Sequence, residues 1–413
     1  MADQRKKIEE QYKRNIIQRE VTPTIDLKNP TALAILGVRR CGKSTLSTQL
    51  FNGQDFGYIN FDDERLLGAT KDDLNTILQI FYELYGTKLE NIILDEIQEI
   101  YGWELFVSRL RDTKKVIITG SSSKLLSSEL STHLTGRHLD LLLFPFSFKE
   151  LLKYKKIETR PNPTTEEKAE IMKTLEDYLN NGGFPERLTI GKQITKNIYE
   201  DIITKDVVIR HKIKHVNDLR QIARYMIANT AKEFTYSSLK NITRVKNMIT
   251  LTNWVKYIEE AYLAFTIEKF SYKLKQTILA PKKTYSVDNG ITNEINTELT
   301  NNKGRLMENT VAIELIKKSK NQRKFNVYYW KNQQGKEVDF ITQHDKTLQL
   351  IQVTNASNQE KIQKREYESL LKASEELQCN NLTIITWDYE KNTTVQGKKI
   401  THTPLWKWLL QQE

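Results

Sequence analysis

The sequence predicts an α/β fold in which a parallel β-sheet is covered by helices, with smaller domains following it. Short apolar runs alternate with helical segments through about the first 150 residues, which is typical of parallel strands joined by helices. A glycine-rich stretch, GVRRCGKST, lies between one such run and a helix. Acidic residues follow two further runs, in NIILDE and YINFDD, at the sheet edge where ligands bind in this kind of fold.

Composition limits the kind of protein. A chain of 413 residues is too long for one core, so about three domains are expected. Two cysteines, Cys41 and Cys379, cannot form a disulfide framework, which indicates a reducing compartment. The first residues, MADQRKKIEE, are too charged for a signal peptide, and the longest apolar run, LDLLLFPFSF, is too short to cross a bilayer. We therefore expect a cytoplasmic protein that is not inserted in a membrane.

The glycine-rich stretch has the spacing of a phosphate-binding loop. An apolar strand at 32–36 precedes Gly37-x-x-x-x-Gly42-Lys43-Ser44, and a helix follows, which is the context that this motif requires. The glycines let backbone N–H groups point inward at a phosphate, and the helix N-terminus adds positive charge. Lys43 is expected to reach the β- and γ-phosphates and Ser44 to bind Mg²⁺. The predicted nucleotide-binding residues are Gly37, Val38, Arg39, Arg40, Cys41, Gly42, Lys43, Ser44 and Thr45.

A second acidic element completes this site. Asp95 ends the apolar run at 91–94 and is expected to bind Mg²⁺ together with Ser44. Glu96 follows directly, in the position of a general base that polarises the attacking water. An Asp-Glu pair favours the additional-strand class of P-loop NTPase, in which the strand ending near Ser121 lies between the other two. GTPases normally lack that glutamate, and no guanine-reading Asn-Lys-x-Asp motif is present.

Two residues after these strands complete the predicted catalytic set. Ser121, or its neighbour Ser122, in VIITGSSS, is expected to approach the γ-phosphate or the attacking water. Arg137, in LTGRHLDL, precedes a fifth strand, in the region where AAA-type assemblies place an arginine that reaches a neighbour's nucleotide. That role requires a homo-oligomer; the alternative is an arginine paired with a surface carboxylate.

These stretches resemble a known family, the prokaryotic AAA-like ATPases with a C-terminal domain of unknown function. The resemblance covers most of the chain and rests on GVRRCGKSTL, NFDDERL, LDEIQEIYGWELFVSRLRD, ITGSSSKLLS, LTGRHLDLLLFPFSFKELL, NNGGFPERL, YSVDNGI and KEVDF. It implies ATP binding and hydrolysis, and leaves the role of the C-terminal half open. The predicted organisation is an ATPase core at 1–155, a helical lid at 156–212, a winged helix at 213–290 and a restriction-endonuclease-like domain at 291–413.

The predicted winged helix carries most of the excess positive charge. Residues 211–290 contain 14 Lys/Arg against 6 Asp/Glu, within a chain of net charge +11. Helices are expected at 220–228, 235–241 and 247–262, followed by strands at 265–270 and 284–287. DNA is one predicted partner, and the alternative is packing against the lid or a protein. The predicted DNA-contacting residues are Thr252, Asn253, Lys256, Lys273 and Lys275.

The C-terminal region resembles the restriction-endonuclease-like fold. A helix at 306–318 carries Glu308, and two strands carry Asp339 and Gln352, which are the predicted ligands of a second metal. Active members of that fold have a lysine where this sequence has Thr354. The loss of such a cation costs several kcal/mol of transition-state stabilisation, so we expect a domain kept for docking or DNA binding without cleavage.

Together these patterns predict an ATP- and Mg²⁺-dependent AAA-like ATPase whose nucleotide state acts on its lid and winged helix. The predicted result of this change is binding to DNA or to a protein partner. Two alternatives stay open. One is a signalling switch that binds only proteins, and the other is an ATP-regulated, metal-dependent DNA nuclease.

Overall fold

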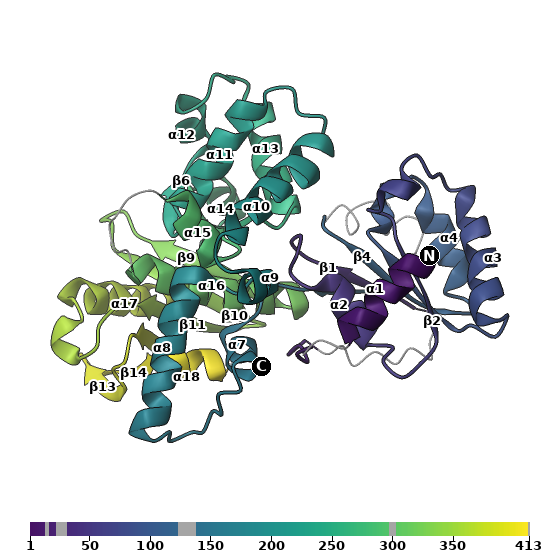
Figure 1. Ribbon diagram of the computed structural model, residues 1–413. Coiled ribbons are helices and arrows are strands. Elements are labelled where there is room, and N and C mark those ends of the chain that lie inside the picture. The colour runs from purple at the N-terminus through teal and green to yellow at the C-terminus, as the bar shows by residue number, and fades with distance from the viewer. Residues whose placement is uncertain (13–15, 22–30, 123–137, 297–302, 412–413) are drawn as a thin grey trace. The chain divides into compact units, whose positions relative to one another are not determined.

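The computed structural model describes the chain except residues 13–15, 22–30, 123–137, 297–302 and 412–413 (Figure 1). The chain forms two compact units, which are described separately. The N-terminal unit contains Met1–Phe144 and Glu260–Tyr262, and the C-terminal unit contains Pro145–Glu259 and Leu263–Glu413. In the described parts of the chain, no helix has both the length and the apolar character needed to cross a membrane.

The N-terminal unit is built on a five-stranded parallel sheet in the order β2-β3-β4-β1-β5. This order confirms the prediction that β4 lies between the phosphate-loop strand and the Asp-Glu strand. Every residue of β1 and β3 is buried, as expected of parallel strands covered on both faces. The strands are β1 (Ala32–Leu36), β2 (Phe56–Asn60), β3 (Asn91–Asp95), β4 (Lys115–Gly120) and β5 (His138–Leu142).

The register of this sheet brings its functional loops to one edge. Asn60 at the end of β2 is opposite Asp95 at the end of β3, and Leu36 at the end of β1 is opposite Gly120 on β4. The connecting helices and turns are α1 (Ala2–Tyr12), α2 (Lys43–Gln49), η1 (Glu64–Leu66), α3 (Asp73–Tyr85), η2 (Ile97–Glu99) and α4 (Trp103–Leu110). Because parallel strands all end at the same edge, residues from four separate loops meet there.

The C-terminal unit begins with helices. Helix α8 falls within the segment predicted as a lid, and a capping box between Thr164 and Glu167 fixes its start. Asn247 caps α13 as expected, because its side chain accepts a hydrogen bond from Ile249 N. The helices of this region are α7 (Phe148–Tyr154), α8 (Thr165–Asn181), α9 (Pro185–Ile190), α10 (Ile194–Asp201), the π-helix η3 (Ile202–Ile209), α11 (Val216–Ala228), α12 (Tyr236–Asn241) and α13 (Met248–Glu260).

One nine-stranded sheet continues through the rest of this unit, in the order β13-β14-β12-β11-β10-β9-β7-β8-β6 (Figure 1). Its strands are β6 (Lys232–Phe234), β7 (Ala264–Lys269), β8 (Lys282–Ser286), β9 (Phe325–Lys331), β10 (Glu337–His344), β11 (Thr347–Val353), β12 (Leu382–Thr386), β13 (Lys391–Val395) and β14 (Lys398–Pro404). The helices joining them are α14 (Leu274–Leu279), α15 (Asn289–Ile295), α16 (Lys303–Asn321), η4 (Gln359–Lys361), α17 (Lys364–Leu377) and α18 (Leu405–Leu410).

The strands of the expected wing, β7 and β8, belong to the same sheet as the C-terminal strands, so this sheet continues across the predicted boundary at residue 290. β7 pairs in parallel with β9, with Glu268 opposite Tyr328, and Phe270 N donates to Tyr329 O at 2.7 Å. This pairing satisfies the backbone of a strand that would otherwise be an exposed edge. The predicted lid, winged helix and nuclease-like domain therefore share one compact unit. The expected hairpin loop also differs, since Lys273 and Lys275 lie at the start of a short helix, α14.

A buried aspartate joins two of the sequence stretches that carry the family resemblance. Asp288 accepts hydrogen bonds from Gly183 N at 2.6 Å and from Gly290 N at 2.8 Å. The chain approaches so closely here that a Cβ on Gly182, which has φ of +74°, would lie 1.9 Å from Asp288 Oδ1. The GGFPE turn is therefore fixed by residues more than 100 positions later in the chain. Burial raises the pKa of Asp288 to about 6, although its three backbone donors oppose this rise.

Replacing Asp288 by asparagine should destabilise the C-terminal unit by about 1–3 kcal/mol, because the amide NH₂ would face the Gly183 N–H and leave that donor unsatisfied. The folded-state pKa of Asp288 is raised from 3.8 to about 6, so its contribution to stability is fully present below pH 3.8 and is lost as the pH rises through about 6. Urea unfolding should therefore show a larger difference between wild type and Asp288→Asn at pH 4 than at pH 7. The exposed Asp345→Asn provides the control and should show no such trend.

Candidate functional site

The phosphate loop follows β1 and requires its glycines. Gly37 has φ of +148°, and a Cβ there would lie 2.1 Å from the carbonyl oxygen of Leu143. Gly42 has φ of +102° and stands directly before α2. Arg40 has φ of +67°, which turns the loop back toward the helix. The loop therefore curls between strand and helix as the motif predicts.

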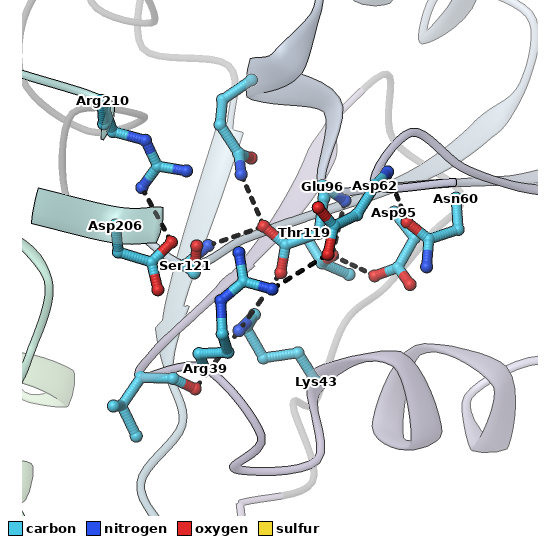
Figure 2. A network of polar contacts seen from close by, with 12 residues as sticks. Arg39, Lys43, Asn60, Asp62, Asp95, Glu96, Thr119, Ser121, Asp206 and Arg210 are labelled. Atoms are coloured by element: carbon cyan, nitrogen blue, oxygen red, sulfur yellow. Dashed lines mark hydrogen bonds and ion pairs between the residues drawn. The ribbon is translucent and has the colours of Figure 1, made fainter. Parts of the chain in front are cut away.

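Lys43 lies inside this loop. Its ammonium donates to Gly37 O at 3.0 Å and Val38 O at 3.3 Å, and its Nζ atom is 3.5 Å from Glu96 Oε1 (Figure 2). The side chain is 4% exposed. The predicted phosphate-binding lysine and the predicted general base thus face each other across the interior of the site.

Asp95 is the most constrained carboxylate of the site. Tyr58 Oη donates to its Oδ2 atom at 2.7 Å, and Thr119 Oγ1 donates to its Oδ1 atom. The hydroxyl of Ser44 is a further partner, so the two predicted Mg²⁺ ligands are in contact. Burial, followed by the charge of Glu96, raises the pKa of Asp95. A hydroxyl and a carboxylate side by side are oxygen donors of the type that Mg²⁺ prefers.

Glu96 is held by both its backbone and its side chain. Its φ of +53° is left-handed, and its N–H donates to Thr119 Oγ1 at 3.1 Å. Its Oε2 atom accepts from Ser121 N at 3.1 Å and from Gln98 Nε2 (Figure 2). Ser121 therefore enters the site through its backbone amide. Arg137, the other predicted catalytic residue of this region, lies outside the described residues.

Sequence reasoning missed several residues that support these carboxylates. Thr119 and Tyr58 are polar side chains on otherwise apolar strands, which is the one signal that pointed to them. Gln98 belongs to the turn η2 that follows Glu96. Arg39 was expected to line the loop, but its ion pair with Asp62 Oδ2 at 2.9 Å was not foreseen. Except for the contact between Gln98 and Glu96, each of these contacts joins segments that are distant in sequence.

In the C-terminal unit, two of the predicted metal ligands, Glu308 and Asp339, lie beside a buried lysine together with Glu337, which was not predicted. Lys283 Nζ lies 2.6 Å from Glu337, 3.0 Å from Glu308 and 3.6 Å from Asp339, and these four residues are named here the Lys283 cluster. Lys283 comes from β8, in the predicted wing, and is 1% exposed. A cation therefore does lie beside Asp339, but it comes from β8 and not from position 354, and sequence reasoning did not consider it.

The remaining contacts of the Lys283 cluster also come from the protein. Val353 N donates to Asp339 Oδ2 at 2.9 Å, Gln352 Oε1 accepts from Asp339 N at 3.4 Å, and Tyr285 Oη donates to Glu308 Oε1 at 2.8 Å. Burial opposes the charge of Lys283, but the surrounding anions raise its pKa above the usual value. Burial, followed by Glu308, raises the pKa of Asp339. Among the described residues, no group of three or more His, Cys, Asp or Glu side chains is arranged to hold a metal ion.

The predicted DNA-contacting residues are exposed but lie on two elements. Helix α13 buries Leu251, Trp254, Val255 and Ile258, which leaves Thr252, Asn253 and Lys256 on its solvent-facing side. Lys273 and Lys275 are exposed at α14. That helix also presents Leu274, Ile278 and Leu279 to solvent. The basic residues are thus accessible, and α14 offers apolar surface beside them.

Three families of domains match the chain. Residues 29–152 match the AAA domain, residues 172–303 match a domain of unknown function (DUF8612), and residues 303–407 match another (DUF4143). The boundary between the two regions of unknown function, at residue 303, falls within the C-terminal unit, after the strands β7 and β8.

Two relatives and two solved structures are similar to the chain. It is 36% identical to the uncharacterized protein MJ1544 of Methanocaldococcus jannaschii, over 91% of this chain and 87% of that one. It is 26% identical to an uncharacterized protein of Haemophilus influenzae, over 97% of this chain and 98% of that one. The first solved structure is a STAND protein of Pyrococcus horikoshii, with 12% identity over 73% of this chain and 47% of that one and a TM-score of 0.26. The second is the ORC1 protein of Aeropyrum pernix in complex with DNA, with 12% identity over 69% of this chain and 88% of that one and a TM-score of 0.31.

Both TM-scores lie below 0.5, so those two structures establish neither a function nor a mechanism for this chain. The match to MJ1544 does establish family membership, because it exceeds 30% identity and covers 91% of this chain and 87% of that one. The AAA domain that matches residues 29–152 contains the loop, Asp95 and Glu96 described above. The chain belongs to the family of prokaryotic AAA-domain proteins that includes MJ1544, with a P-loop ATPase-like domain followed by DUF8612 and DUF4143 regions.

Proposed function

We propose that the chain binds and hydrolyses ATP, and that the nucleotide state of its AAA domain controls DNA binding by its C-terminal unit. The observation that carries the first part is the convergence of Lys43, Asp95 and Glu96 at one edge of the parallel sheet. ATPases need a cation for the phosphates, a metal-binding carboxylate and a base for water, and this edge contains all three.

Each residue has a distinct part in the proposed reaction. Lys43 binds the β- and γ-phosphates and neutralises the charge that develops on them. Glu96 accepts a proton from the attacking water while the new P–O bond forms and the bond to ADP breaks. Gln98 and the amide of Ser121 orient the Glu96 carboxylate for this transfer.

Ser44 and Asp95 are the residues that would hold Mg²⁺. The contact between the Ser44 hydroxyl and the Asp95 carboxyl supports this, since two oxygen donors already converge there. Mg²⁺ bound at these residues supplies positive charge to the phosphates. Tyr58 and Thr119 keep the carboxylate in one orientation by donating a hydrogen bond to each of its oxygens.

Electrostatics support DNA as the partner of the C-terminal unit. Residues 211–290 carry an excess of positive charge, and Lys256, Lys273 and Lys275 are exposed on helices α13 and α14. Exposed lysines attract the phosphate backbone without base specificity. The exposed apolar residues of α14 favour the alternative, a protein partner, and the salt dependence of binding distinguishes the two.

We further propose that the Lys283 cluster is a structural ion-pair network and not a nuclease centre. Lys283 occupies the space between the three carboxylates that a metal ion would otherwise fill, at 2.6 to 3.6 Å from each. The network continues through Glu337 to Lys331 and from there to Glu233 on β6. Its ion pairs therefore connect helix α16 with the strands β10, β8, β9 and β6 of the same sheet.

Lys43→Ala should abolish ATP binding, because the loop loses the cation that contacts the β- and γ-phosphates. Glu96→Gln should leave binding intact and lower turnover at least about 100-fold, because the amide cannot accept the proton. Equilibrium binding of a fluorescent ATP analogue and release of phosphate measure the two effects. Glu99→Gln, exposed in the same turn, should behave as wild type. Unchanged turnover in Glu96→Gln would contradict the assigned site.

The triple variant Lys256→Ala, Lys273→Ala, Lys275→Ala should weaken DNA binding and reduce the slope of log K against log salt concentration by about 3. Gel shifts of the full-length chain between about 50 and 200 mM salt measure this slope. The triple variant Lys364→Ala, Arg365→Ala, Lys372→Ala, on α17, is the matched control for lost charge. If wild type binds no DNA at low salt, the protein-binding alternative is favoured.

Lys283→Met should destabilise the C-terminal unit by about 3–5 kcal/mol, because it leaves buried carboxylates without their counter-ion. Denaturant unfolding measures this loss, with Lys346→Met as the exposed control. Wild type incubated with plasmid DNA and Mg²⁺ or Mn²⁺ should produce no nicks. Cleavage that disappears in Asp339→Ala would instead assign nuclease activity to the Lys283 cluster.

A further inference from the structure

The ion pair between Arg39 and Asp62 crosses the phosphate site. Arg39 belongs to the loop after β1, whereas Asp62 follows β2, and β4 and β3 lie between those two strands. Three strand spacings separate β1 from β2, or roughly 14 Å. The Arg39 side chain must therefore extend over the ends of β4 and β3, where Ser121 and Glu96 lie. Figure 2 shows Arg39 and Asp62 in one network with Lys43 and Glu96.

The two partners in this ion pair differ in their surroundings. Arg39 Nη1 lies 2.9 Å from Asp62 Oδ2, and the exposed fractions of the side chains are 12% for Arg39 and 37% for Asp62. An ion pair with one partly solvated carboxylate is weak, whereas a guanidinium binds a phosphate group with two parallel hydrogen bonds. A triphosphate bound in the loop therefore offers Arg39 a stronger partner than Asp62.

We propose that Arg39 is a catalytic arginine that contacts the γ-phosphate from within the same chain, and that Asp62 is its partner when no γ-phosphate is bound. This inference rests on the proposed ATPase function and adds a regulatory step to it. Arg39 exchanges Asp62 for the γ-phosphate when ATP binds, and returns to Asp62 after hydrolysis. Asp62 precedes the turn η1, so the exchange alters the charge balance of the segment after β2 each time ATP is hydrolysed.

The chemistry requires no further group. Water forms the new bond to the γ-phosphorus and gives its proton to Glu96, and the bond to the β–γ bridging oxygen breaks with its electron pair remaining on ADP. Arg39 gains and loses no proton, since its guanidinium stays charged in proteins. It stabilises the negative charge on the γ-phosphoryl oxygens as the bond breaks. The predicted role of Arg137 requires a neighbouring subunit, whereas Arg39 acts in each chain alone.

The test compares wild type with Arg39→Ala, Arg39→Lys and Asp62→Asn. Arg39→Ala should lower turnover by about 10²- to 10³-fold and weaken binding of a non-hydrolysable ATP analogue, while ADP binding stays unchanged. Arg39→Lys should restore part of the analogue affinity and little turnover, because an ammonium lacks the planar pair of donors. Asp62→Asn should strengthen analogue binding several-fold without affecting ADP, because the Asp62 carboxylate no longer competes with the γ-phosphate for Arg39.

Arg65→Ala is the control, since Arg65 also pairs with nearby carboxylates, Asp3 and Asp63, but at the protein surface. Turnover per subunit should not depend on protein concentration in wild type. The inference is overturned if Arg39→Ala changes the ratio of analogue to ADP affinity by less than about threefold, or if Asp62→Asn leaves that ratio unchanged. The Asp62 variant tests the idea even if the Arg39 variants do not fold.

Failure of the inference is distinguishable from failure of the proposed function. If wild type hydrolyses ATP and Lys43→Ala does not bind it, but Arg39→Ala matches wild type, the ATPase assignment stands and the role of Arg39 is wrong. If wild type neither binds nor hydrolyses ATP, both are overturned. If turnover per subunit rises steeply with protein concentration and Arg39→Ala behaves as wild type, the result would instead favour an arginine supplied by a second copy of the chain.

Discussion

The ion pair between Lys43 and Glu96 is the interaction around which the N-terminal unit is organised. A lysine ammonium that is almost fully buried needs anionic or carbonyl partners, and here the loop carbonyls and one carboxylate provide them. This arrangement depends on Gly37 and Gly42, which let the loop curl, and on the register that aligns the ends of the four strands. The carboxylates, in turn, depend on Thr119, which contacts both Asp95 and the backbone of Glu96.

A second buried lysine has different surroundings. Lys43 lies near Glu96 and two carbonyl oxygens of the phosphate loop, at the edge of the sheet where the proposed nucleotide would bind. Lys283 lies within 3.6 Å of three carboxylates that come from α16 and β10. A buried lysine thus belongs to the proposed phosphate site in one unit and to an ion-pair network in the other.

The C-terminal unit is held together by contacts between segments that the sequence separates widely. Asp288 binds the backbone of Gly183, the Lys283 cluster ties β8 to α16 and β10, and β7 pairs with β9. Each of these contacts crosses a boundary that the sequence patterns placed between domains. The segments predicted as a lid, a winged helix and a C-terminal domain are therefore joined by buried polar contacts within one compact unit.

The sequence by itself determined the phosphate loop, the Asp-Glu pair and the short apolar strands beside them. These features follow from local patterns, because glycine spacing and apolar runs act within a few positions of the chain. The position of β4 in the first sheet was expected only from the class of P-loop NTPase that the Asp-Glu pair favours. Only the tertiary structure decided that Lys283 faces Asp339 and Glu308, that Arg39 reaches Asp62, and that the expected wing joins the C-terminal sheet. Side chains brought together from distant strands leave no local pattern, because their partners are selected by sheet order and register rather than by sequence spacing.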